Sequence, residues 1–599
     1  MPTAIVTGQP VPGSSLEGDL RSLGFDVRTA ADSAEARNLI AAAPADGRVA
    51  LVDARFVGHA HALRLGLTDP RFPLAAVPGA VTAQGTARQA LNLALDAQDE
   101  SGGGTAVAVD SLPDRLVTAL DADGTPVHRP ELGSLVAAVP ADPQARNEAR
   151  QAVLAVDEED VRLKSAVKSR DGFFTTFCIS PYSRYLARWC ARRGLTPNQV
   201  TTASLLTALI AAACAATGTR PGFVAAGVLL IASFVLDCTD GQLARYSLQY
   251  STLGAWLDAT FDRAKEYAYY AGLALGAARG GDDVWALALG AMILQTCRHV
   301  VDFSFNEANH DATANTSPTA ALSDKLDSVG WTVWVRRMIV LPIGERWAMI
   351  AVLTAVTTPR ITFYVLLVGC ALAAAYTTAG RVLRSLTRKA SRTDRAALAL
   401  ADLADSGPLA GAPRRLFERG LPGLAVPAVA LLGGVAVVAC SALTGFGGWL
   451  PVAGAVVYVL TSALAVARPL KGSLDWLVPP FFRAAEYGTV LALAARADVR
   501  GALPAAFGLV AAVAYHHYDT VYRIRGDAGA PPAWLVRAIG GQEGRTLLVT
   551  VLAALLTASQ FTVALTVIAV CVALLVLVES IRFWVSAGAP AVHDEGETA

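Results

Sequence analysis

Lysine is scarce in this sequence of 599 residues: the chain has six lysines, and arginine supplies the other 44 of its 50 basic residues. Fifty acidic residues balance them, so the formal net charge is zero and we expect no nucleic acid partner. The eight cysteines are scattered, without the pairing of a zinc site or a disulfide framework. The start, MPTAIVTGQPVPG, lacks a basic stretch followed by an apolar core, so we expect no cleaved signal peptide.

Apolar residues make up 53% of the chain, and the mean hydropathy is +0.43, which is too apolar for a soluble protein of this length. From residue 200 onward, apolar runs recur at the ~20-residue length that a membrane-spanning helix needs. We predict spans at 199–218, 222–238, 254–277, 284–304, 337–357 and 361–383, and a second set near 421–441, 449–467, 481–497, 501–519, 545–559 and 561–583.

Residues 1–150 have a different pattern. TAIVTG, FDVRTA and RVALVDARFV are typical of buried strands and alternate with helical stretches, which indicates an α/β layer. The predicted fold class is mainly α: a polytopic membrane protein with a six-helix bundle, a second helical membrane block and a small α/β domain. The predicted parts are an α/β domain at 1–150, a linker with an interfacial amphipathic helix at 151–198, a first membrane block at 199–383, a cytosolic linker at 384–416, a second membrane block at 417–585 and a tail at 586–599.

Arginine placement predicts the topology. SRYLARWCARR precedes the first span and RSLTRKASR follows the sixth, and basic loops of this kind stay in the cytosol. We therefore expect the α/β domain in the cytosol and the segment 237–262 at the cytosolic ends of spans two and three.

Four carboxylates interrupt these two spans. Asp237 and Asp240 are three residues apart, and Asp258 and Asp262 are four apart, so each pair shares one face of its helix. An ionised carboxylate in a membrane costs several kcal/mol unless it is paired or bound to a metal. If the two faces meet, the charges repel one another unless cations are present, and an all-oxygen site of this kind suits Mg²⁺.

The stretch DCTDGQLARYSLQYSTLGAWLDATFD resembles the signature of CDP-alcohol phosphotransferases, D-x2-D-G-x2-A-R-x8-G-x3-D-x3-D, without departure. DGFFTTFCISPYSRYLARW and LTPNQVT also resemble that family's interfacial helix and the entry to its first span. The eight fixed positions of the signature are Asp237, Asp240, Gly241, Ala244, Arg245, Gly254, Asp258 and Asp262.

The resemblance implies an integral membrane transferase. It would move a phosphoalcohol group from a CDP-alcohol, such as CDP-diacylglycerol or a CDP-polyol, to a hydroxyl acceptor and release CMP. Two divalent cations, Mg²⁺ or Mn²⁺, would be held by Asp237, Asp240, Asp258 and Asp262, and Asp262 would also act as the general base. The CDP-binding residues would be Asp237, Asp240, Gly241, Ala244, Arg245 and Gly254. The acceptor would carry a hydroxyl and, in one alternative, a phosphate; a homodimer is left open.

Basic residues lie in or beside spans three to five. Those at the membrane boundary are explained equally by anchoring at the cytosolic face. In the family that the motif resembles, an acceptor phosphate is bound by basic residues near the metals. The candidates for that role are Lys265, Arg298, Arg336, Arg337 and Arg346.

The second membrane block resembles a degenerate copy of the first. WLDATFDRAKEY at 256–267 aligns without gaps with WLVPPFFRAAEY at 476–487, and WVRRMIVLPIGERW at 334–347 resembles WLVRAIGGQEGRT at 534–546. We expect Arg483 and Glu486 to pair on one helix. The positions matching the four aspartates are Leu460, Ala463, Val478 and Phe482, so this block is predicted to bind no divalent metal.

Two further functions stay open at this point. Duplicated membrane blocks with intramembrane acids also occur in transporters, although a transporter would usually keep polar groups in both halves. A non-catalytic scaffold is the other alternative. The α/β domain resembles a nucleotidyltransferase weakly: its first turn, TGQPVPGSS, lacks the expected G-x-G-x-R, so we expect a non-catalytic relic or a regulatory module.

Overall fold

The computed structural model describes residues 2–100, 111–168, 171–310, 338–387, 391–414, 421 and 423–586. The chain divides into two compact units. The first unit comprises Met1–Ser169, Ser183–Pro197 and Thr239–Tyr250, and the second comprises the rest.

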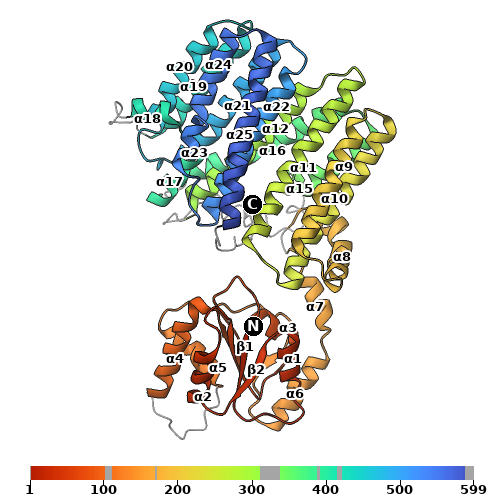
Figure 1. The fold of residues 1–599 in the computed structure, drawn as a ribbon, viewed down its shortest axis with the longest axis vertical. Coiled ribbons are helices and arrows are strands. Elements are labelled where there is room, and N and C mark those ends of the chain that lie inside the picture. Colours follow the sequence, from red (N-terminus) through yellow and green to blue (C-terminus); the bar gives the residue numbers. More distant parts are fainter. Residues whose placement is uncertain are drawn as a thin grey trace. The chain divides into compact units, whose positions relative to one another are not determined.

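The first unit contains a five-stranded sheet with the strand order β2-β1-β3-β6-β5 (Figure 1). Parallel pairing joins β1 to β2 and β3, whereas β6 runs antiparallel to both β3 and β5. The predicted α/β layer is therefore confirmed, with a mixed sheet. The bounds are β1 Thr3–Thr7, β2 Asp26–Ala30, β3 Val49–Asp53, β5 Leu74–Val77 and β6 Ala80–Ala83.

Both faces of this sheet are covered. Ile5 and Leu51 belong to one buried cluster, while Val6 and Val52 belong to another. Neighbouring strand residues point to opposite faces, which explains why β1 and β3 are buried at every position. The helices of this part are α1 Leu16–Ser22, α2 Ser33–Ala42, α3 Ala60–Leu67, α4 Arg88–Glu100 and α5 Leu112–Ala122, followed by α6 Pro143–Leu154, α7 Glu158–Ser165 and α8 Ser180–Arg192.

A helix lies at each of the predicted spans. The first block contains α9 Pro197–Ala216, α10 Arg220–Ser247, α11 Thr252–Arg279, α12 Trp285–Asn309, α15 Ile343–Val356 and α16 Pro359–Thr387. The second block contains α19 Ala425–Leu443, α20 Leu450–Ala465, α21 Val478–Ala497, α22 Ala502–Arg525, α24 Gly541–Leu555 and α25 Ala558–Ser586. Five of these helices, α9, α10, α16, α19 and α25, are long and apolar enough to cross a membrane. The mainly α, membrane-type fold class is confirmed, and the remaining spans stay predictions.

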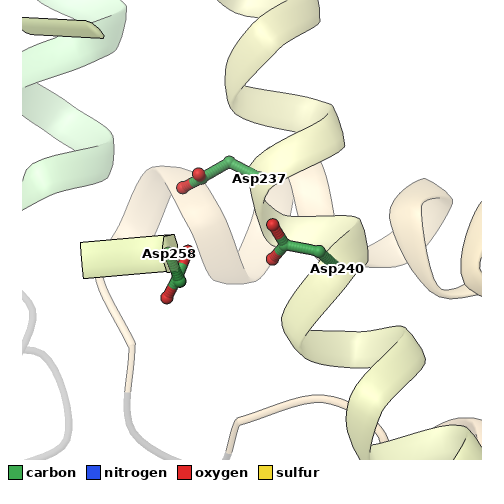
Figure 2. A group of neighbouring side chains, drawn as sticks. All are labelled: Asp237, Asp240 and Asp258. Carbon is green, nitrogen blue, oxygen red and sulfur yellow. The ribbon is translucent and has the colours of Figure 1, made fainter. Parts of the chain in front are cut away.

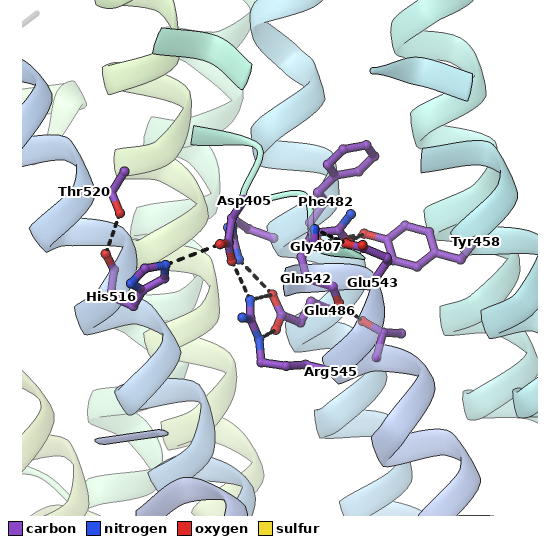
Figure 3. Close-up of polar contacts among 12 residues, drawn as sticks. Asp405, Gly407, Tyr458, Phe482, Glu486, His516, Thr520, Gln542, Glu543 and Arg545 are labelled. Atoms are coloured by element: carbon purple, nitrogen blue, oxygen red, sulfur yellow. Dashed lines mark hydrogen bonds and ion pairs between the residues drawn. The ribbon is translucent and has the colours of Figure 1, made fainter. Parts of the chain in front are cut away.

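The segment predicted as a linker contains two helices, α17 Asp394–Leu403 and α18 Pro408–Arg414. Asp405 lies between them and is buried in the second block, with its carboxylate 3.1 Å from Arg483 Nη2. The carboxylate also lies 2.7 Å from Arg545 Nη2 (Figure 3). On its other side, His516 Nε2 lies 3.3 Å from Asp405 Oδ1. The described part of this segment therefore packs into the second block; the predicted domain boundaries stay predictions.

Corresponding ion pairs occur in the two blocks. Glu486 binds Arg483 at 2.9 Å, as the sequence predicted, and also binds Arg545 at 2.5 Å. In the first block Glu266 binds Arg263 at 2.9 Å and Arg346 at 3.4 Å. These are the residues that the sequence alignment matches, and the last helix of each block, α16 or α25, is 29 residues long. These observations support the interpretation of the second block as a degenerate repeat.

Asp405 gives a direct test of the buried ion network. Replacing it in Asp405→Ala leaves Arg483 and Arg545 with one carboxylate fewer in a dry core, and breaking a buried ion pair costs about 3–5 kcal/mol. We expect a clearly lower midpoint of thermal unfolding for the full chain in detergent. The matched control is Asp394→Ala, because the side chain of Asp394 is 94% exposed in its pair with Lys471. Equal midpoints for the two variants would contradict the structural role of Asp405.

Candidate functional site

Three carboxylates from two helices converge in the first block. Asp237 and Asp240 lie on α10 and Asp258 lies on α11, and one oxygen of each is within 4.8 Å of the others (Figure 2). Asp240 is buried, with 4% of its surface exposed. Three carboxylate oxygens at this spacing match the donors that a hard divalent cation prefers, so these residues fit a metal ion.

Local sequence explains why α11 begins where it does. The Ser251 side chain caps the helix by accepting a hydrogen bond from the Gly254 N–H at 2.9 Å. A Cβ added at Gly254 would lie 2.8 Å from Asn198 Oδ1 and 2.8 Å from Ser251 Oγ, so both side chains would have to shift to accommodate it. This packing brings Asp258, one turn further along α11, toward α10.

Asp262 reaches the same region through a lysine. Lys265, with 1% of its surface exposed, forms ion pairs with Asp237 and with Asp262, the latter at 2.8 Å, and donates to Ser204 Oγ at 3.2 Å. The sequence predicted four metal-holding carboxylates; the close group contains three of them, with Asp262 held beside Asp237 by Lys265. The metal-binding and catalytic roles of all four stay predictions.

The residues predicted for the donor surround the end of α10. A Cβ at Gly241 would meet the Arg245 guanidinium at 3.5 Å, an ordinary contact, so packing within the protein does not require glycine at that position. Arg245 Nε donates to the Ala166 carbonyl oxygen at 2.6 Å, which ties its side chain to the end of α7. Ala244 lies half-buried one residue before it.

The acceptor candidates have different surroundings. Lys265 is at the carboxylates, whereas Arg346 is buried against Glu266, with its Nη2 3.4 Å from Glu266 Oε2. Arg298 Nη2 donates to the Val340 carbonyl oxygen, and its Nε and Nη1 have no hydrogen-bond partner among the described residues. Arg336 and Arg337 lie outside the described residues.

Two features of the site were missed from the sequence. Lys265 was considered only as an acceptor residue, although its spacing of three from Asp262 permits an ion pair on one helix. Glu266 was not considered, yet it neutralises both Arg263 and Arg346 in the core. The sequence alignment could have revealed the role of Glu266. It matches Glu266 with Glu486 and Arg263 with Arg483, so the pair expected between Arg483 and Glu486 implies a pair between Arg263 and Glu266.

Lys265 provides the prediction of this site. In Lys265→Met the carboxylates of Asp237 and Asp262 lose their buried cation, which costs several kcal/mol unless another cation replaces it. We expect Mg²⁺ to raise the unfolding temperature of this variant, relative to EDTA, by more than it raises that of the unchanged protein. Lys164→Met is the control, since Lys164 is 68% exposed in its pair with Asp160. An equal effect of Mg²⁺ in all three proteins would show that Mg²⁺ does not replace the charge of Lys265 at these carboxylates.

Comparisons with known proteins match two parts of the chain. Residues 194–375 match the family described as CDP-alcohol phosphatidyltransferase, and residues 394–599 match a family of unknown function, DUF5941. The second match begins where α17 begins, so it includes the segment that carries Asp405.

Curated relatives resemble the first block. A phosphatidylinositol phosphate synthase of Streptomyces avermitilis is 34% identical over 131 residues, 20% of this chain and 51% of the relative. An archaetidylinositol phosphate synthase of Pyrococcus horikoshii is 30% identical over 113 residues, 19% of this chain and 58% of the relative. A bifunctional IPC transferase and DIPP synthase of Aquifex aeolicus is 31% identical over 114 residues, 19% of this chain and 26% of the relative.

The chain thus spans between about a quarter and somewhat more than half of the length of the curated relatives that it matches. The family match covers α9 to most of α16, including every fixed position of the signature. With its five long apolar helices, the chain is a multi-pass membrane protein. The resemblance found in the sequence is confirmed for residues 194–375, which match the CDP-alcohol phosphatidyltransferase family.

Proposed function

We propose that this protein transfers a phosphatidyl-type group from a CDP-alcohol to a hydroxyl of an alcohol acceptor and releases CMP. The observation that carries the proposal is the convergence of Asp237, Asp240 and Asp258, three fixed residues of the signature, in a domain of the matching family. The oxygen of the acceptor hydroxyl forms a new bond to the β-phosphorus of the donor, while the bond from that phosphorus to the CMP oxygen breaks.

The residues of the site have separate roles in this proposal. Asp237, Asp240 and Asp258 would hold Mg²⁺ or Mn²⁺, which supplies positive charge to the diphosphate and to the leaving group. Asp262 accepts the proton of the acceptor hydroxyl, and Lys265 keeps the carboxylates of Asp262 and Asp237 side by side before substrate binds.

The room at Gly241 suits the donor, because a methyl group there would extend only toward Arg245. Arg245 donates to the Ala166 carbonyl through Nε, and its terminal nitrogens are suited to bind phosphate oxygens. We therefore assign Gly241, Ala244 and Arg245, with Gly254, to the CDP pocket.

The names of the relatives support a proposal for the donor and the acceptor. Two of them are named phosphatidylinositol phosphate synthases, which favours CDP-diacylglycerol over a CDP-polyol as donor and a phosphorylated polyol as acceptor. Arg298, with two nitrogens that have no partner among the described residues, is our candidate for binding the acceptor phosphate. Arg346 is a weaker candidate, because Glu266 already neutralises it.

We place the protein in the cell membrane of a bacterium with this site facing the cytosol. The basic stretches SRYLARWCARR and RSLTRKASR, on either side of the first block, support that orientation. Both a CDP-linked donor and the released CMP would then be accessible from the cytosol.

The test separates the base from the metal ligands. Asp262→Asn removes a general base, a group that contributes roughly 10²–10⁴-fold to a rate, so we expect CMP release to fall by that amount while donor binding in Mg²⁺ persists. Asp240→Asn should lose CMP release and also weaken donor binding. The control is Asp498→Asn. Asp498 is exposed and has a left-handed backbone conformation, which asparagine also adopts readily. Near-normal CMP release by Asp262→Asn or Asp240→Asn would refute the assignment.

A further inference from the structure

Helix α11 has two functional faces. At about 100° per residue, the side chains of Asp258, Asp262 and Lys265 lie on one face of the helix. Trp256 and Arg263 lie on the opposite face, and both are buried, with 7% and 8% of their surface exposed. What packs on that opposite face therefore determines how α11 is rotated about its axis.

The second block covers that face with two aromatic side chains. The first is Trp584 on α25, whose ring stacks on Trp256 with ring centroids 6.2 Å apart and planes 20° apart. Trp584 Nε1 donates to Asp519 Oδ1 at 2.7 Å, and Ser580 Oγ donates to the same oxygen at 2.7 Å. Because these bonds fix Trp584 within the second block, its ring is a rigid support for Trp256.

The second aromatic side chain is Tyr518 on α22. Its ring lies 5.1 Å from the Arg263 guanidinium, and its hydroxyl is hydrogen-bonded to His299 Nδ1. His299 Nδ1 lies 3.3 Å from Arg263 Nη1, so Tyr518, His299 and Arg263 form one connected group. Arg263 directly follows Asp262 in the chain, so a shift of Arg263 moves the carboxylate beside it.

The contact between the blocks is continuous with the core. One buried cluster contains residues of both blocks, among them Leu273 and Phe363 of the first and Phe507 and Val572 of the second. In this core α11 packs on α22 and α25, and α12 packs on α21 and α22 (Figure 1). Interiors packed in this way transmit small displacements between neighbouring helices.

We infer that the second block is a built-in partner of the carboxylate site, and that Tyr518 and Trp584 are positioning residues that hold α11 in the rotation at which Asp258 meets Asp237 and Asp240. This assigns a role to the part of the chain that matches a family of unknown function. The block keeps this role although Leu460, Ala463, Val478 and Phe482 stand at the positions matching the aspartates. The inference rests on the proposed function only for its link to catalysis, because metal binding tests it separately.

The first experiment measures Mn²⁺ binding by electron paramagnetic resonance on the full chain in detergent. Trp584→Ala removes the support of Trp256, and we expect it to weaken Mn²⁺ binding roughly tenfold, in the range found for residues that orient metal ligands. Trp584→Phe keeps an aromatic ring on Trp256 and should restore most of the affinity. Val585→Ala changes the neighbouring residue, which is 69% exposed, and should bind Mn²⁺ as the unchanged protein does.

The second variant distinguishes a loss of metal binding from a loss of folding. Tyr518→Phe keeps the ring on Arg263 and removes the hydroxyl bound to His299, so it should fold and bind Mn²⁺ more weakly than the unchanged protein. CMP release is measured on the same samples and should fall in parallel.

The outcomes are distinct. Unchanged Mn²⁺ binding by folded Trp584→Ala and Tyr518→Phe would overturn the inference, even if both unfold at lower temperature. If Trp584→Ala does not fold, the result for Tyr518→Phe decides. If the unchanged protein binds Mn²⁺ but releases no CMP from any CDP-alcohol, the proposed function fails, whereas the inference still stands or falls on the Mn²⁺ affinities.

Discussion

A carboxylate buried in a membrane protein needs a cation close by, and both membrane blocks are organised around that requirement. In the first block Lys265 supplies the cation for Asp237 and Asp262. In the first block one cation lies between two carboxylates, whereas in the second block one carboxylate, Asp405, lies between two buried cations, Arg483 and Arg545. Because carboxylates and cations pair in both networks, ionisable side chains can be buried among apolar helices.

The two blocks differ in the partners of their buried charged side chains. In the second block, Asp405 and Glu486 supply the carboxylates that pair with Arg483 and Arg545. Lys265, in contrast, pairs with Asp237, which belongs to the group of three carboxylates that fits a divalent cation. The shared Arg–Glu–Arg arrangement supports the interpretation of the second block as a degenerate repeat of the first.

Much of this could be predicted from the sequence. Apolar runs of membrane length predicted twelve helices in the described part of the two membrane blocks. The family resemblance predicted one site for Asp237, Asp240, Asp258 and Asp262, and the first three of these lie together. The pair of Arg483 and Glu486 also followed from local spacing, since residues three apart on a helix are neighbours.

Contacts between distant segments could not be predicted. Asp405 follows a short helix in a polar stretch, and nothing local indicates that it reaches Arg545, 140 residues later. Likewise Tyr518 and Trp584 resemble ordinary core aromatics until the packing of α22 and α25 on α11 is known. The antiparallel strands β5 and β6 were missed for a related reason, because strand pairing in a sheet depends on the whole chain.

The central claim is that the carboxylates of the first block, and not their counterparts in the second, hold divalent metal. Anomalous X-ray scattering from crystals grown with Mn²⁺ and a CDP-alcohol locates the metal directly. The account predicts manganese peaks among Asp237, Asp240 and Asp258, with the diphosphate against them. Crystals without a peak there, or with a peak between α20 and α21 of the second block, would contradict it.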